Sequence, residues 1–253
     1  MTSTEKENID KNKIPVHIAV IMDGNGRWAK RKGKERIIGH QHGVKAVREV
    51  TEAAAELGVK YLTFFAFSTE NWQRPADEVN ALMSLLVNTL NAEIDTLMKN
   101  NIKLNTIGNL DILPGTVRKN LMKTIGRTAG NKGMTLTLAL SYSARWEVAK
   151  AARDLARDVA EGTVDVDKID EKLFAQYLQT KNIPDPDILI RTSGEYRISN
   201  FLLWQIAYTE LYFTKKLWPD IRKKDLYRAI ADYQRRERRF GRISEQTKLN
   251  EDR

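Results

Sequence analysis

Six short apolar runs recur along the chain, each rich in β-branched or aromatic residues and short enough to form a strand. They span residues 16–22, 61–67, 102–107, 134–140, 187–190 and 210–213. Between most of them lie stretches with apolar residues at helical spacing, of which the clearest are residues 40–57, 76–100, 146–161 and 223–240. Strands that alternate with helices predict an α/β fold, in which a mainly parallel sheet is covered by helices on both faces.

The chain of 253 residues has no linker rich in Pro or Gly, so we expect a single domain, which we place at residues 14–243. Residues 1–13 are polar and are expected to form a disordered tail, and residues 244–253 form a second polar tail. The chain has neither a run of about 18 or more apolar residues nor an apolar signal segment. We therefore expect a cytoplasmic protein.

The amino-acid composition limits the kinds of site and partner that the chain can have. The chain has no cysteine, which excludes disulfides, thiol catalysis and thiolate metal sites, so any metal is held by oxygen or imidazole ligands. The net charge of +9 favours a negatively charged partner: nucleic acid, anionic lipid or a phosphorylated small molecule. Basic residues are concentrated at positions 27–36 and 235–242.

The segment Asp23-Gly24-Asn25-Gly26-Arg27-Trp28-Ala29 directly follows the first predicted strand. Ligands of open α/β sheets bind beyond the carboxyl ends of strands, and two glycines allow backbone N–H groups to approach an anion closely. Arg27 adds a forked cation that suits phosphate oxygens. The segment therefore predicts a diphosphate-binding loop, and an ordinary tight turn is the alternative.

A carboxylate at such a loop would repel a diphosphate unless a cation lay between them. Mg²⁺ commonly takes one or two protein carboxylates and completes its shell with water and phosphate oxygens. We therefore predict that Asp23 is a magnesium ligand; an exposed turn aspartate is the alternative.

Two further polar segments follow predicted strands. Residues 67–75 (FSTENWQRP) bring hydroxyls, an amide and an arginine to the same edge of the sheet, although Ser68 could merely cap a turn and Trp72 could belong to the core. In residues 187–200 (DILIRTSGEYRISN), Arg191 and Arg197 flank a Ser-Gly turn and are placed to clamp a second diphosphate. Surface ion pairing with Glu195 is the alternative.

Together with E-L-Y-F at residues 210–213, these segments resemble the cis-prenyltransferase family, which includes undecaprenyl diphosphate synthases and other isoprenyl transferases. The resemblance runs from about residue 14 to residue 241. The motifs that carry it are D-G-N-G-R-W-A, S-T-E-N-W-x-R-P, D-I-L-I-R-T-S-G-E-x-R-I-S-N and E-L-Y-F. Three positions depart from the usual pattern: Ser143 and Ala144 replace a Gly-Gly pair, and Tyr196 replaces a histidine found in some relatives.

The resemblance implies a homodimeric, magnesium-dependent enzyme that condenses isopentenyl diphosphate onto an allylic diphosphate such as farnesyl diphosphate. Its implied product is undecaprenyl diphosphate for the bacterial cell-wall lipid carrier, released through transient contact with a membrane surface. Asp23 and Glu210 match the residues that hold the metal, and Asp23 and Asn71 match the catalytic residues. The positions matching substrate contacts are Gly24, Asn25, Gly26, Arg27, Trp28, Arg36, His40, Ser68, Thr69, Glu70, Trp72, Arg74, Arg191, Arg197, Ile198 and Ser199.

For Asn71 and for the helix of residues 76–100, the resemblance is weighed against the chemistry of the residues themselves. Asn71 matches a residue usually named as proton acceptor, but a neutral amide is a poor base, so we expect it to orient other groups. The helix of residues 76–100 carries one apolar face that either lines a tunnel for the growing tail, as in the family, or is simply core. That face consists of Val79, Leu82, Met83, Leu86, Leu90, Ile94 and Leu97.

Three alternatives remain at this point. A basic nucleic-acid-binding module would fit the pI near 9.6 and the arginine-rich stretch near the C-terminus, but it predicts indifference to Asp23, and we expect no nucleic-acid partner. A cis-prenyltransferase with another product length and a non-catalytic relative that supports a partner subunit are closer rivals. The presence of Asp23, Arg191, Arg197 and Glu210 argues against the non-catalytic relative.

Overall fold

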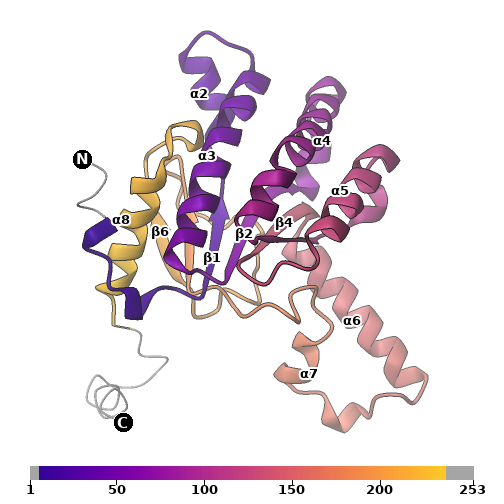
Figure 1. The fold of residues 1–253 in the computed structure, drawn as a ribbon. Helices are drawn as coiled ribbons and strands as arrows, with labels where there is room; N and C mark the ends of the chain where they lie inside the picture. The colour runs from indigo at the N-terminus through magenta and orange to yellow at the C-terminus, as the bar shows by residue number, and fades with distance from the viewer. Residues whose placement is uncertain (1–5, 238–253) are drawn as a thin grey trace.

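The computed structural model describes residues 6–237, which are built around one six-stranded sheet (Figure 1). All neighbouring strands are parallel, in the order β3-β4-β2-β1-β5-β6. The strands are β1 (His17–Ile21), β2 (Tyr61–Ser68), β3 (Lys103–Ile107), β4 (Thr135–Tyr142), β5 (Ile188–Arg191) and β6 (Glu210–Phe213). Each matches a predicted strand, so the α/β prediction is confirmed.

Seven α-helices connect and flank these strands within the described residues: α2 (Asn25–Arg31), α3 (Arg36–Leu57), α4 (Ala76–Lys99), α5 (Gly115–Thr128), α6 (Ala144–Ala160), α7 (Glu171–Ala175) and α8 (Lys223–Gln234). Short 3₁₀ helices cover Lys11–Lys13, Thr69–Gln73, Leu110–Ile112, Val166–Lys168 and Trp218–Asp220. The four helices predicted from periodicity correspond to α3, α4, α6 and α8.

Three helices were missed, and one predicted helix was too long. The buried residues of α5 are Val117, Leu121, Thr124 and Thr128, so half of its inward face is threonine and the apolar period is weak. The predicted helix over residues 223–240 ends at Gln234, and its last residues, 238–240, lie outside the described part of the chain.

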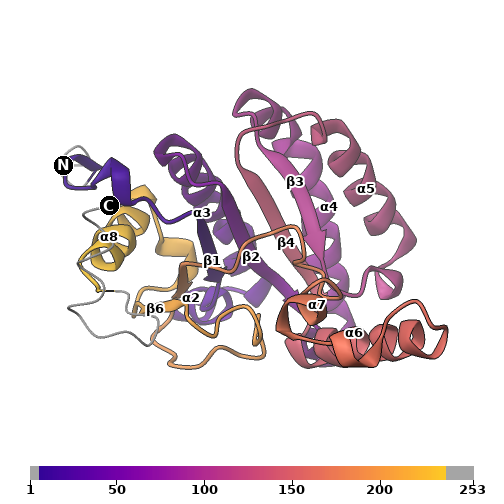
Figure 2. The ribbon, with the colours of Figure 1, turned by 90° about the horizontal axis from the view of Figure 1, so that it is seen from below.

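Side chains of β1 alternate between two cores, one on each face of the sheet. Ile18 and Val20 pack in a cluster with buried residues of α3, α4, α5 and α8. Ala19 and Ile21 face the other way, toward a cluster that includes Phe201. Figure 2 shows α6 and α7 lying together, apart from α3, α4 and α5. The sheet is therefore buried on both faces, as a parallel sheet requires.

The beginning of the chain differs from the expected tail. Ile9 is only 6% exposed and belongs to the main core, and the Gln234 side chain donates to the backbone oxygens of Asp10 and Lys13 at 2.8 and 3.0 Å. Ile9 therefore anchors the segment to the core, and the Gln234 hydrogen bonds join it to α8. The other tail residues, 1–5 and 244–253, lie outside the described residues.

The register of the parallel strands places the three predicted polar segments at one edge of the sheet. Ile21 pairs with Phe65 of β2 on one side and with Arg191 of β5 on the other, so three neighbouring strands end at the same edge of the sheet. The segments that follow them carry Asp23, residues 68–74 and residues 192–200. Within residues 6–237, no helix combines the length and apolarity that crossing a bilayer requires.

Candidate active site

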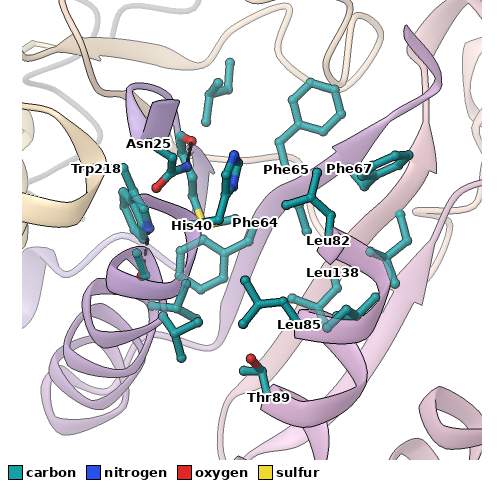
Figure 3. A pocket seen from close by; sticks show the side chains of 18 of the residues that line it. Asn25, His40, Phe64, Phe65, Phe67, Leu82, Leu85, Thr89, Leu138 and Trp218 are labelled. Atoms are coloured by element: carbon teal, nitrogen blue, oxygen red, sulfur yellow. Dashed lines mark hydrogen bonds between the residues drawn. The ribbon is translucent and has the colours of Figure 1, made fainter. Parts of the chain in front are cut away.

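A cavity of about 680 Å³ lies between α3 and α4, with the sheet as its floor (Figure 3). Its mouth is at the carboxyl ends of the strands, where Asp23, Asn25 and Arg191 contribute to the wall. Its interior is lined mainly by apolar side chains of α4 and the sheet: Leu82, Met83, Leu86, Leu90, Leu97, Phe64, Leu104, Leu136, Leu138 and Leu140. Five residues of the predicted apolar face of α4 thus line a cavity, whereas Val79 and Ile94 are buried elsewhere.

The Asp23 carboxylate lies between two arginines. Its Oδ2 atom accepts hydrogen bonds from Arg191 Nη2 at 3.0 Å and from Arg27 Nη2 at 3.1 Å. The Arg191 side chain is 4% exposed, whereas that of Asp23 is 29% exposed. One side of the carboxylate is therefore neutralised by the protein while another remains accessible.

The pKa of Asp23 lies below its ordinary value. Burial alone would raise it, but hydrogen bonds from Arg191 and Ser193 and the positive charges of Arg27 and Arg191 outweigh that effect. Asp23 is therefore a carboxylate at neutral pH, the form that binds a cation.

Arg191 organises the third predicted segment. Its Nη1 atom donates to Ser199 Oγ at 2.6 Å and to the backbone oxygen of Arg197. The Arg197 side chain is 62% exposed and pairs with Glu195 at 2.6 Å, which is the contact that the surface ion-pair alternative predicted. Glu195 also pairs with Arg27 at 2.9 Å, so one acid holds two cations of the predicted diphosphate site.

The D-G-N-G segment begins two residues after the end of β1 and enters α2 at Asn25, so it is a short connection rather than an extended loop. Gly24 precedes the helix with φ of 106°, and a Cβ atom there would lie 2.8 Å from a side-chain atom of Leu217. Both the backbone angle and the contact require glycine. Gly26 lies in the first turn beside the Arg36 guanidinium, and a Cβ atom there would lie 3.1 Å from Arg36 Cζ.

The second segment forms the 3₁₀ helix Thr69–Gln73 with a capping box at its start. Asn71 Oδ1 accepts a hydrogen bond from the Ser68 backbone N–H at 3.1 Å, so the predicted cap role of this turn is present. Asn71, Ser68 and Glu70 line the cavity. The Thr69 hydroxyl donates to Glu70 at 3.3 Å and is not among the lining residues.

The two predicted tryptophans lie outside the cavity wall. Trp72 donates to Ser141 Oγ at 2.9 Å and packs on the main core, as the alternative predicted. Trp28 is 7% exposed, and its indole N–H donates to Asp220 at 2.8 Å. Neither ring contributes to the wall. Ile198, also predicted as a contact, is half-buried and lies outside the lining as well.

At the other side of the mouth, Arg36 and Arg74 share Glu78, at 3.3 and 3.0 Å. His40 lines the cavity beside this group, and burial first, then the charge of Arg74, lowers its pKa to about 4. The imidazole is therefore neutral at pH 7, and Figure 3 shows it near Asn25.

Glu210 is not near Asp23 within one chain. It pairs in register with Ile188 at the start of β5, whereas Asp23 follows the ends of the strands, roughly 10 Å further along the sheet. Its carboxylate forms an ion pair with Arg236 at 2.8 Å. Arg235 and Arg236 both contact Asp232, and the rest of the predicted basic cluster, residues 238–242, lies outside the described chain.

The mouth fits a magnesium diphosphate better than a metal held by the protein alone. Residues 6–237 contain no group of three His, Cys, Asp or Glu side chains that could enclose an ion. Asp23 supplies one accessible carboxylate, and Mg²⁺ with phosphate and water ligands needs little more. Four buried side-chain atoms lack hydrogen-bond partners among the described residues, and two of them are the acceptor Asn25 Oδ1 and the donor Arg191 Nε. Both side chains line the mouth, so one is suited to a cation or its water and the other to a phosphate oxygen.

Sequence reasoning missed three residues with roles at the mouth, Glu78, Ser193 and Asn200, and named a fourth, Glu195, only as a surface ion-pair partner. Glu78 stands four positions after Arg74 in the first turn of α4, a spacing that could have predicted the pair. Glu195 and Ser193 bind Arg27 across 166 or more positions, and Asn200 donates to Glu70 Oε1 and Ser143 Oγ at 3.0 and 2.6 Å. No local signal predicts such long-range contacts.

Comparisons with known proteins agree with this geometry. Residues 21–241 match the family model described as "Putative undecaprenyl diphosphate synthase". An isoprenyl transferase of Chlorobaculum tepidum is 56% identical over 94% of this chain and 90% of its own. The ditrans,polycis-undecaprenyl-diphosphate synthase ((2E,6E)-farnesyl-diphosphate specific) of Pasteurella multocida is 51% identical over 93% of this chain and 97% of its own.

Solved structures lead to the same group of proteins. Lavandulyl diphosphate synthase from Lavandula x intermedia, in complex with dimethylallyl diphosphate, superposes with a TM-score of 0.89 and 40% identity, covering 91% of this chain and 99% of its own. A probable undecaprenyl diphosphate synthase from Campylobacter jejuni gives a TM-score of 0.75 at 34% identity, over 90% of this chain and 99% of its own.

Proposed function

The chain belongs to the undecaprenyl diphosphate synthase family and carries out cis-prenyl chain elongation, and we propose that it adds isopentenyl diphosphate units to farnesyl diphosphate. The farnesyl primer is proposed because it appears in the name of the relative from Pasteurella multocida. The lavandulyl diphosphate synthase complex with dimethylallyl diphosphate supports an allylic diphosphate as the substrate class.

One observation carries this proposal: a cluster of charged groups at the mouth of a long apolar cavity. Asp23, Arg27 and Arg191 gather where three parallel strands end, and the cavity extends from there between α3 and α4. A prenyl diphosphate has a negatively charged head and a hydrocarbon tail, so its two parts match the two parts of the site.

We further propose that Asp23 holds Mg²⁺, with Asn25 Oδ1 as a nearby acceptor for the ion or one of its waters. The ion would act as a Lewis acid on the diphosphate leaving group. Glu210 remains a proposed metal residue only if a second protomer brings it to the mouth, because within one chain it lies at the opposite end of the strands.

Different arginines bind the two diphosphates. Arg27, Arg36 and Arg74 surround the allylic side with His40, whose neutral imidazole can donate a hydrogen bond without adding charge. Arg191, Arg197 and Ser199 form the isopentenyl side, where the buried Arg191 Nε still lacks a partner. Exchange of Glu195 for substrate phosphate would free the guanidinium groups of Arg27 and Arg197.

In each condensation the allylic carbon–oxygen bond breaks, the isopentenyl double bond attacks that carbon, and a proton leaves to form the new cis double bond. Fixed cations stabilise the charge that develops on the departing diphosphate. The apolar wall excludes water from the allylic carbon. Because Asn71 Oδ1 already accepts from the Ser68 N–H, we propose that Asn71 orients groups and that a diphosphate oxygen accepts the proton.

We propose undecaprenyl diphosphate as the product and supply of the cell-wall lipid carrier as its use, on the basis of the relatives' names. We also propose a cytoplasmic homodimer that touches a membrane surface when the product leaves. β6 is an outermost strand of the described sheet, and two large side chains are exposed at it, Leu211 in the strand and Tyr208 two residues before its start. Such an edge is suited to pairing with a second copy.

The test uses purified protein with farnesyl diphosphate, labelled isopentenyl diphosphate and Mg²⁺, and products are sized by reversed-phase chromatography. We expect a ladder that ends at undecaprenyl length, that needs the metal, and that Asp23→Ala abolishes. A different endpoint would change the product but keep the reaction. No extension of any allylic primer would refute elongation by this chain.

A further inference from the structure

One wall of the cavity is not apolar. Among its lining residues, α3 contributes Arg48, Thr51 and Glu52, and α4 contributes Thr89, Glu93 and Thr96. The spacings are three or four residues in each helix, so each set forms a polar stripe along one side of its helix. Figure 3 shows Thr89 below Leu82 and Leu85, on the part of α4 that is far from His40.

The two stripes are joined by an ion pair. Arg48 Nε donates to both carboxylate oxygens of Glu93 at 3.0 Å, and Arg48 Nη2 donates to Glu93 Oε1. The Glu93 side chain is 16% exposed and that of Arg48 is 51% exposed, so the carboxylate is covered while the arginine, which also lines the cavity, is partly open to solvent. An arginine that contacts both oxygens has a well-defined geometry.

Within residues 6–237, two ion pairs connect α3 to α4, one at the mouth of the cavity and one near its inner end. Arg36 and Glu78 meet at the mouth, and Arg48 and Glu93 meet roughly 20 Å further along the helices. Between them the wall is mostly apolar, with side chains such as Val47 and Leu86. Opening the side of the cavity therefore requires breaking the inner pair.

We propose that Arg48 and Glu93 form a strap that closes the side of the cavity and determines the tail length at which elongation stops. This inference rests on the proposed function, in which the cavity holds the growing tail. Each condensation adds five carbons, so the tail advances from the mouth until it meets the polar stripes. There the tail would contact the buried Thr51 hydroxyl, which has no hydrogen-bond partner among the described residues. Contact between hydrocarbon and this polar group is unfavourable.

The strap should bias the endpoint rather than impose an absolute limit. A partly exposed ion pair contributes little free energy, so a tail that pushes the helices apart can break it. In the intact protein the added cost favours release of the product over another condensation. Without the strap, the tail can leave between α3 and α4, and elongation continues.

The first test compares Glu93→Gln and Arg48→Met with the parent enzyme. We expect the ratio of products longer than the parental endpoint to those at the endpoint to rise about two- to fivefold, the factor that corresponds to one such ion pair. The rate of the first condensation should stay within about twofold of the parent, because the strap lies far from the mouth. An unchanged or shortened product distribution in both variants would overturn the inference.

Arg127→Met is the matched control. Arg127 is 50% exposed and joins α5 to Asp95 of α4 at 3.6 Å, so its loss also removes an ion pair of α4, but away from the cavity. The product distribution of this variant should equal that of the parent. A shift as large as that of Arg48→Met would mean that general loosening of α4, not the strap, changes the length.

A second set of variants distinguishes the charges of the ion pair from the linkage that it makes between α3 and α4. The exchange Arg48→Glu/Glu93→Arg should restore the parental endpoint. Because the chain has no cysteine, Arg48→Cys/Glu93→Cys can also be bridged selectively with a short thiol-reactive cross-linker. We expect long products before bridging and the parental endpoint after it; identical products in both states would refute the strap. Failure of the parent enzyme to elongate any primer would instead refute the proposed function.

Discussion

Arg191 Nη2 and Asp23 Oδ2 lie 3.0 Å apart although 168 positions separate the two residues in the chain. The contact follows from the parallel pairing of Ile21 with Arg191, which places the end of β5 beside the turn that carries Asp23. The almost fully buried guanidinium then reaches Ser199 as well. One side chain therefore connects the proposed metal residue to the proposed isopentenyl site.

Replacing Arg191 by Lys should impair both binding and stability. Lysine keeps the charge but cannot reproduce the fork that contacts Asp23, Ser199 and the backbone at once. We expect the KM for isopentenyl diphosphate to rise about tenfold or more and the free energy of unfolding to fall by about 1–3 kcal/mol. Steady-state kinetics and urea denaturation measure the two effects. Arg197→Lys is the control, because its exposed side chain should affect KM alone.

Stability should fall in mildly acidic solution because of His17. Burial lowers the pKa of this 1% exposed imidazole from 6.5 to about 4, while Pro184 O and Thr63 Oγ1 lie within hydrogen-bond distance of its two ring nitrogens. The unfolded chain binds the proton more readily, so the contribution is complete above pH 6.5 and is lost as the pH falls toward 4. Its size is on the order of 3 kcal/mol.

The measurement is urea denaturation between pH 7.5 and 4.5, which runs from about one unit above the unfolded pKa of His17 to about half a unit above the folded one. His17→Asn should be less stable at neutral pH but should show a flatter dependence on pH. The exposed His42→Asn variant provides the comparison and should keep the parental slope. A parental slope in His17→Asn would contradict the assignment.

Asn71→Ala should lower kcat far more than it weakens isopentenyl diphosphate binding, if the amide orients groups during the reaction. The variant also loses the acceptor for the Ser68 N–H, so the turn itself can shift. Asn71→Asp retains that acceptor and separates the two effects: it should fold like the parent yet turn over slowly. Equal losses in kcat and in binding for Asn71→Ala would indicate that the residue only positions substrate.

Asn200 connects three segments of the mouth. Its side chain donates to Glu70 and Ser143 and accepts from the Arg145 N–H at 3.0 Å. Asn200→Ala should therefore destabilise the protein by about 1–3 kcal/mol and raise the KM of isopentenyl diphosphate. The residue has φ of 61°, a region that glycine adopts without strain. Asn200→Gly should thus show the loss of the hydrogen bonds without backbone strain and be the milder variant.

Leu211→Lys should convert the proposed homodimer to a monomer. Leu211 is 38% exposed on β6, and a charge there opposes close pairing of the strand with a second copy. Light scattering after size-exclusion chromatography measures the mass. Met122→Lys, on the exposed side of α5, is the control and should leave the mass unchanged. A parental Leu211→Lys mass would place any dimer contact elsewhere.

The sequence by itself predicted the sheet because each strand has a local signal. Runs such as residues 61–67 are apolar and β-rich, and their positions are confirmed within one or two residues. The motifs around Asp23, Asn71 and Arg191 were enough to identify the family, since a motif is a pattern along the chain. Helix α5 escaped because two of its four buried positions are threonines.

The contacts between segments that are distant in the chain were decided only by the tertiary structure. Register places Asp23 beside Arg191 but puts Glu210 at the other end of the strands, a distinction that no motif contains. Likewise, the sequence of α4 has the same apolar period whether its apolar face packs in the core or lines a cavity. The period shows which residues are turned away from water, but not what lies opposite them. The packing of α3 against the sheet leaves that space open and brings Arg48 to Glu93.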